Sequence, residues 1–314
     1  MLPAAAAHAD TGSWDRADQA TVVHAGVLAN LAGGFQGSAA LTPSALQAAL
    51  TAVAPRTGGR PVQVASAAVT VVAFDRALVL QLGLGDVAAS IEAEARRAGL
   101  NPPSYFGPEV VARALSLRYN HPASQDRLEL YPSDVITRAE AAYSLARVLA
   151  MSKWQLQAVR ATFATFKLPQ YSSAQRAALT LAVSKIGMPY VWGGTTDDRS
   201  DGLAHGGYDC SGFVWRVFKV SGNPAGRRIG GRTAAQMAGE IARSQRLPLS
   251  KVRGGDILFF GPSRFGGRAS ESGIVHAGIA LSGTFMIDSS DEGVYVQPLT
   301  DWHRIWFSWA RRVL

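Results

Sequence analysis

The chain has 314 residues, of which 47% are apolar and 17% are charged, and it carries a formal net charge of +8. This length exceeds what one hydrophobic core usually supports, so we expect two domains. No uninterrupted apolar run approaches the about 18–20 residues that would span a bilayer, and we expect no membrane span.

The positive charge is concentrated in the second half of the chain. Residues 1–150 hold 11 arginines and 12 acidic residues, whereas residues 151–314 hold 20 lysines or arginines and 11 acidic residues. A basic surface favours polyanionic partners, such as nucleic acid or an anionic cell wall. Because the arginines are scattered and no nucleic-acid motif accompanies them, we expect a cell-wall partner and no nucleic acid.

Residues 1–37 are predicted to be a loose leader, since they are small and polar with little periodicity. Ala7, His8 and Ala9 fit the cleavage site of a secretory signal. The charged and apolar parts that should precede such a site are missing, so either the chain begins downstream of its natural start or the match is chance. We favour the first, and expect a secreted or cell-wall-associated protein. One cysteine cannot form an internal disulfide, so the sequence neither requires nor excludes an oxidising compartment.

Residues 38–165 show helical periodicity. Thr42 is placed to cap a helix whose first residue is Pro43. Further helices are predicted over 85–98, 108–119 and 137–165. The sequence therefore predicts a mainly helical first domain.

This helical domain contains two stretches of similar sequence pattern. VTVVAFDRALVLQLGL and DVITRAEAAYSLARVL each place a threonine before an apolar helical pattern. The pair resembles the repeats of S-layer homology modules, which attach proteins to cell-wall polymers, and the resemblance implies an anionic wall polymer as a partner of residues 38–165. Helical packing alone would produce much of the same pattern, and that alternative stays open.

A second domain is predicted over residues 166–314. Pro169 stops the preceding helix, and Ser172 with Gln175 forms a capping box that opens a helix ending at Gly187. Glycine-rich turns and short strand-like runs follow, among them GDILFF, VHAGIAL, TFMID and GVYVQPL. One or two helices followed by a meander of strands predict an α+β domain.

The only cysteine, Cys210, lies at the start of a helical pattern. Asp209 or Ser211 can cap that helix, which places the thiol at the positive end of the helix dipole and favours the thiolate. The charge of Asp209 opposes this effect, so a partner cation is required. A buried, inert cysteine is the alternative.

The cation should be a histidine. His8, His24 and His121 are predicted to be surface residues, and His205 lies on a glycine-rich loop near the thiol. His276 opens a strand on which it shares a face with small residues, which leaves the imidazole uncovered. We therefore predict that His276 is the base.

Asp288 is the candidate for the group that orients the imidazole. HAGIALSGTFMID predicts a hairpin, and Asp288 reaches the His276 face only if the loop has an odd number of residues. A three-residue loop with Gly283 in the left-handed region satisfies this. A surface acid beside the turn is the alternative.

Six motifs of the second half of the chain together resemble a known family. YVWGG, DCSGFV, RTAAQM, GDILFF, HAGIAL and MIDSS with GVYV occur in the order found in NlpC-type cysteine peptidases of bacterial peptidoglycan. The resemblance covers residues 172–314. It implies a papain-like core in which a helix-borne cysteine packs against a sheet that carries the base.

The resemblance also implies roles for single residues. Cys210 matches the nucleophile, His276 the general base and Asp288 the third polar position; Tyr190 matches a tyrosine lining the site, and Asp209 and Ser211 match positions that hold the substrate peptide. The third position is commonly histidine in this family, whereas here it is aspartate. The loop between Gly194 and Asp209 is also long and polar, and we expect it to affect specificity more than chemistry.

The implied activity is hydrolysis of peptidoglycan stem peptides, between D-γ-glutamate and a diamino acid, through a thioester on Cys210. No metal or organic cofactor is needed. An N-acetylmuramoyl-L-alanine amidase or an acyltransferase with the same thiol chemistry is one alternative, and a non-catalytic cell-wall-binding protein is another.

Overall fold

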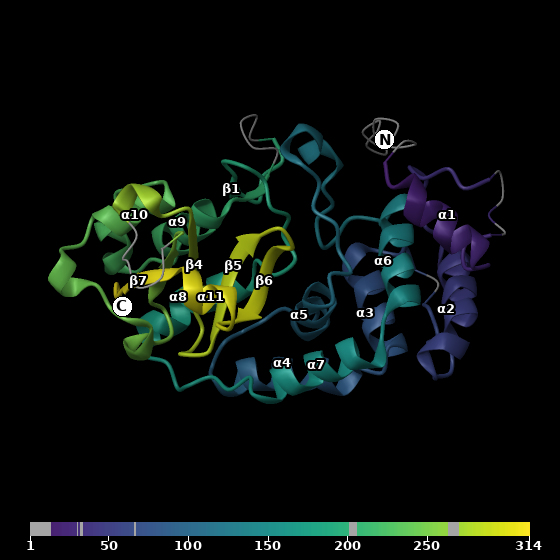
Figure 1. The fold of residues 1–314 in the computed structure, drawn as a ribbon, viewed down its shortest axis with the longest axis horizontal. Coiled ribbons are helices and arrows are strands. Elements are labelled where there is room, and N and C mark those ends of the chain that lie inside the picture. The colour runs from purple at the N-terminus through teal and green to yellow at the C-terminus, as the bar shows by residue number, and fades with distance from the viewer. Residues whose placement is uncertain (1–13, 30, 32–33, 66, 201–205, 263–269) are drawn as a thin grey trace.

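The computed structural model describes residues 14–29, 31, 34–65, 67–200, 206–262 and 270–314. Its α-helices are α1 (Arg16–His24), α2 (Pro43–Thr57), α3 (Val71–Gln81), α4 (Gly85–Arg97), α5 (Phe106–Ala114), α6 (Arg138–Ala150), α7 (Lys153–Ala164), α8 (Ser173–Val183), α9 (Cys210–Val220), α10 (Ala234–Gly239) and α11 (Trp302–Trp306). Its strands are β1 (Thr195–Thr196), β2 (Gly207–Tyr208), β3 (Ile257–Phe260), β4 (His276–Ala280), β5 (Phe285–Ser290), β6 (Gly293–Pro298) and β7 (Phe307–Arg311). Helices α1 to α7 come first, and the strands follow (Figure 1).

Threonine caps begin three of the early helices. Thr42 accepts a hydrogen bond from the Ala45 amide, as predicted, and Thr70 and Thr137 cap α3 and α6 in the same way. The extended segments before these helices meet, because Ala40 pairs with Thr137 and Thr70 pairs with Val135. The two similar stretches, which include α3 and α6, therefore have matching local structures. Their binding of a wall polymer stays a prediction.

Three helix boundaries differ from the predicted ones. The single helix predicted over 137–165 is wrong: α6 ends at Ala150, and Ser152 forms a capping box with Gln155 that starts α7. The helix predicted over 108–119 is shorter, since Ser116 adopts a positive φ of 51°. Helix α8 starts at the predicted capping box but ends at Val183, before Gly187.

A five-stranded antiparallel sheet follows, in the order β6-β5-β4-β3-β7. Helix α9 packs against β4 and β5 (Figure 1). Phe213 and Val217 of α9 lie in the same apolar core as Ile279 and Ile287, so the helix covers the face opposite to Gly278 and Asp288. The predicted α+β architecture is confirmed, and this packing anchors the helix that begins at Cys210.

The loop of the β4–β5 hairpin has an odd number of residues, as the predicted position of Asp288 requires. Gly278 pairs with Asp288 and Ala280 with Met286, which leaves Ser282 to Thr284 in the turn. Gly283 does not adopt the left-handed conformation that we predicted. The Ser282 hydroxyl accepts hydrogen bonds from the Thr284 and Phe285 amides instead, and these stabilise the turn without a left-handed residue.

The helices and the sheet share a seam. Helix α5 contacts β6, and Arg113 of α5 donates to the carbonyls of Gly187 and Glu292. Arg199, which follows β1, also pairs with Asp134, which precedes α6. Within the described residues, no helix combines the length and the hydropathy needed to cross a membrane.

Candidate active site

Cys210 is the first residue of α9. Asp209 is the N-cap, and its Oδ1 accepts a hydrogen bond from the Gly212 amide at 2.5 Å. Of the two caps that the sequence allowed, Asp209 is therefore the one used. The thiol lies at the positive end of the helix dipole and is 9% exposed, which suits a nucleophile reached from one side.

His276 and Asp288 meet beside this thiol. The Cys210 Sγ lies 4.0 Å from the carbonyl oxygen of Val275, the residue before His276. His276 Nε2 donates to Asp288 Oδ2 at 2.7 Å, and Asp288 is fully buried. Since Nε2 is engaged by Asp288, Nδ1 is the nitrogen that remains for Cys210.

The protonation of His276 follows from these neighbours. Burial alone would lower the pKa of His276, but hydrogen bonds and charges from Asp288 and Cys210 raise it to about 10. An imidazolium is therefore favoured at neutral pH, and it supplies the cation that the thiolate requires.

A cleft of about 550 Å³ opens on the thiol. It is lined by Tyr190, Trp192, Gly193, Asp209, Cys210, Ser211, Arg232, Thr233, Ala234, Ala235, Ile274 and Val275. Trp192 is 75% exposed, so the rim offers an apolar surface to a bound peptide. Burial and the charges of Cys210 and Asp209 raise the pKa of Tyr190, so its hydroxyl keeps its proton and can donate.

Arg232 holds the two residues predicted to bind substrate. Its guanidinium donates to both carboxylate oxygens of Asp209, at 3.1 and 3.0 Å, and to Ser211 Oγ at 2.8 Å. It also donates to the Gly193 carbonyl at 2.9 Å. The negative charge of Asp209, which opposes a thiolate, is thus balanced by Arg232, a role that sequence analysis missed although RTAAQM was among its motifs.

Asn120 reaches the cleft from the helical part of the chain. Its Oδ1 accepts from the Tyr190 amide at 2.8 Å, and its Nδ2 donates to the Tyr190 carbonyl at 3.1 Å. The side chain thus fixes the main chain of one cleft residue. Nothing in the local sequence indicated this contact, because the two residues are 70 positions apart.

The other histidines are less suited to the role of base. His24 is exposed as predicted, whereas His8 and His205 lie outside the described residues. The surface prediction for His121 is wrong: it is 3% exposed, because Nε2 hydrogen-bonds Glu140 and Trp14 and Tyr119 enclose the ring. His303, which sequence analysis did not weigh, is buried behind Phe260, and burial lowers its pKa.

A thiol at a helix N-terminus, beside a strand-borne imidazole and a buried carboxylate, defines a papain-like α+β arrangement. Within the described residues, no group of His, Cys, Asp or Glu is placed to hold a metal ion. Residues 187–311 match the NlpC/P60 family model, and this part of the chain is an NlpC/P60 domain.

Several proteins are similar over the same part of the chain. A probable endopeptidase p60 of Listeria grayi is 35% identical over 128 residues, which are 40% of this chain and 20% of that protein. A gamma-D-glutamyl-L-lysine dipeptidyl-peptidase of Bacillus subtilis is 30% identical over 115 residues, which are 37% of this chain and 32% of that protein. The chain thus spans about a fifth to a third of the length of these curated relatives.

A solved structure is also similar. The NlpC/p60 domain of the peptidoglycan hydrolase SagA is 28% identical, with a TM-score of 0.32, over 44% of this chain and 97% of that one.

Proposed function

We propose that this protein is a peptidoglycan hydrolase that cleaves stem peptides, between D-γ-glutamate and a diamino acid, by cysteine chemistry. The observation that carries the proposal is the Cys210–His276–Asp288 arrangement within an NlpC/P60 domain. The names of the two relatives, an endopeptidase and a gamma-D-glutamyl-L-lysine dipeptidyl-peptidase, support this substrate class. Such a substrate implies action outside the cytoplasm.

In the proposed mechanism, the Cys210 thiolate attacks the scissile carbonyl. The Cys210 amide, at the start of α9, and the Tyr190 hydroxyl donate to the oxyanion. His276 holds the proton that the leaving amine needs, because its pKa is raised to about 10. The neutral imidazole then takes a proton from water, which hydrolyses the thioester, and Asp288 keeps Nε2 protonated and stabilises the imidazolium.

The substrate would lie along the cleft beside Arg232. The carboxylate of Asp209 is already paired with the guanidinium, so we assign Asp209 and Ser211 to shaping the cleft wall jointly with Arg232. Tyr190 and Trp192 also line the cleft. No step requires a metal or organic cofactor.

Mass spectrometry of defined stem peptides, and of muropeptides in which the stem is joined to the sugar, tests the proposal. We expect the full chain to release a fragment ending in D-glutamate, Cys210→Ala to release none, and Asp288→Ala to leave a measurable remainder, because removing an orienting group costs less than removing the nucleophile. Release of the whole stem from the sugar would indicate the amidase instead. Binding to cell walls with no new amine would contradict any hydrolase.

A further inference from the structure

Asp288 is a fully buried carboxylate with a second partner. Its face of the sheet also carries an apolar cluster, which includes Phe260, Ala280 and Met286. A buried carboxylate is stable only where donors satisfy its oxygens. Oδ2 accepts from His276 Nε2 at 2.7 Å, and Oδ1 accepts from Gln297 Nε2, also at 2.7 Å. The two side chains together satisfy both oxygens.

The sheet register places Gln297 for this contact. Tyr295 of β6 pairs with Asp288, and Gln297 pairs with Met286, so Gln297 shares the Asp288 face one diagonal away. Because β5 lies between β4 and β6, His276 and Gln297 approach the carboxylate from opposite sides. A polar relay therefore crosses three adjacent strands, from His276 through Asp288 to Gln297.

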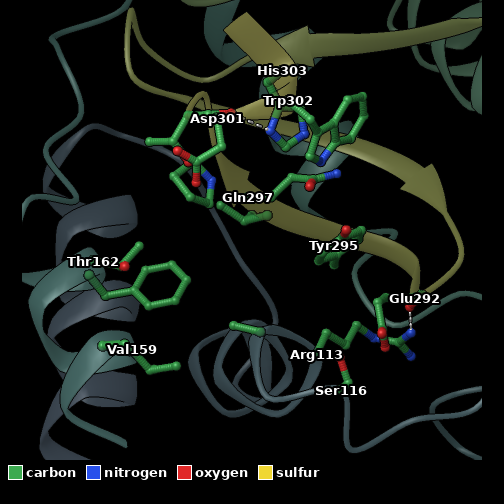
Figure 2. Close-up of a pocket in the computed structure, with 16 residues that line it drawn as sticks. Arg113, Ser116, Val159, Thr162, Glu292, Tyr295, Gln297, Asp301, Trp302 and His303 are labelled. Atoms are coloured by element: carbon green, nitrogen blue, oxygen red, sulfur yellow. Dashed lines mark hydrogen bonds between the residues drawn. The ribbon is translucent and has the colours of Figure 1, made fainter. Parts of the chain in front are cut away.

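Gln297 is itself buried. It is 6% exposed and lines a cavity of about 390 Å³ between β6, α5 and α7. Figure 2 shows its side chain between Tyr295 and the Trp302–His303 pair. An uncharged amide is suited to this position, because it donates to the carboxylate without adding a cation that would compete with His276 for the charge of Asp288.

We propose that Gln297 is a positioning residue for the cysteine chemistry. Its amide orients Asp288 so that Oδ2 faces His276 Nε2, and this leaves His276 Nδ1 directed at Cys210. Gln297 touches neither thiol nor substrate and acts through Asp288. The inference deepens the proposed function and rests on it for the reaction, although the effect on the thiol can be measured without any substrate.

Alkylation of Cys210 by iodoacetamide provides that measurement, since the chain has a single cysteine. The rate is followed against pH in the full chain and in Gln297→Met, a variant of similar size that cannot donate. Near pH 6.5 we expect a rate about tenfold lower, because a buried acceptor is left without a donor and the imidazolium that supports the thiolate is loosened. At high pH the two rates should converge, since the thiolate then forms without help.

Gln297→Glu separates positioning from packing. At low pH the protonated carboxyl can donate to Asp288 in place of the amide, so the rate should approach that of the unchanged protein. As the introduced carboxyl ionises, two carboxylates face one another and the rate should fall to that of Gln297→Met. Lost packing alone would not produce this rescue at acid pH.

Tyr295→Phe is the matched control. Tyr295 pairs with Asp288 in the sheet, but its hydroxyl bonds Ser290, so this variant should keep the original profile. The proposal is overturned if both Gln297 variants follow the unchanged protein, or if both are slowed equally at every pH with a lowered melting temperature. Stem-peptide cleavage is measured in parallel: an unchanged protein that alkylates as expected without cleaving would overturn the hydrolase, while the Gln297 result would stand.

Discussion

Asp288 places a negative charge directly beside His276. Its contact with His276 is short and fully buried on the carboxylate side, so the two groups interact with little screening by water. Together with Cys210 it raises the pKa of His276 to about 10. The identity of this one residue therefore affects the pH range in which the folded protein is stable.

The unfolding free energy should fall as pH rises from about 6.5 to about 10. The unfolded histidine loses its proton near its ordinary pKa of 6.5, whereas the folded one keeps it up to about 10, so the folded state binds the extra proton in this window. The stabilisation is complete below the lower value and is lost as pH passes the upper one.

Urea unfolding at several pH values checks this, with His276→Gln as the comparison. The decline over the window should be smaller in the variant, because glutamine binds no proton. Parallel curves for the two proteins would contradict the raised pKa.

At the scale of elements, the N-terminus of α9 is stabilised from a distance. Asp209 caps the helix, and Arg232, just before α10, binds Asp209, Ser211 and the Gly193 carbonyl. The capping of α9 was predictable, because cap and helix are adjacent in sequence. The Arg232 contact was not, because it depends on how a separate segment folds back over the loop.

Arg232→Met should destabilise the fold by about 1–2 kcal/mol, since the Asp209 carboxylate, Ser211 Oγ and the Gly193 carbonyl each lose a partly buried, charged donor. The loss is smaller than for a buried arginine, because the Arg232 side chain is 33% exposed and water screens its charge. Lys219→Met, on the exposed last turn of α9, removes the same charge and should change stability by less than about 0.5 kcal/mol. Equal effects in urea unfolding would show that net charge, and not the Asp209 contact, is responsible.

At the scale of the whole molecule, the helical part of the chain contributes to the cleft. Asn120 holds the main chain of Tyr190 through both its amide and its carbonyl, and Arg113 binds the carbonyls of Gly187 and Glu292. We propose a division near residue 166, with residues 38–165 acting as a support for the cleft as well as a candidate wall anchor.

Asn120→Ala in the full chain should lower kcat/KM on stem peptides about tenfold, because Tyr190 loses both main-chain contacts and the oxyanion donor becomes less well placed. Asn101→Ala, at an exposed position of the same region, is the control and should behave as the unchanged protein. Equal activity of both variants would mean that Tyr190 keeps its position without the helical part.

Much of the fold followed from local patterns. The threonine cap at Thr42, the capping box at Ser172 and the helix starting at Cys210 are read from neighbouring residues. An odd number of loop residues in the β4–β5 hairpin also correctly predicted that Asp288 shares a face with His276, although the role assigned to Gly283 was wrong. Contacts such as Asn120 with Tyr190 carry no local signature, because only the tertiary fold creates them.

The polar relay has a consequence for the order of folding. His276 and Asp288 are 12 positions apart and Gln297 is 9 positions beyond Asp288, whereas Cys210 contacts Val275 across 65 positions. Short loops close at a lower entropic cost than long ones, and contacts that are local in sequence form sooner. The two hairpins that carry the relay should therefore assemble before α9 docks. Until that last step the thiol stays open to oxidants, so oxidants should readily inactivate a refolding chain before α9 docks and much less readily afterwards.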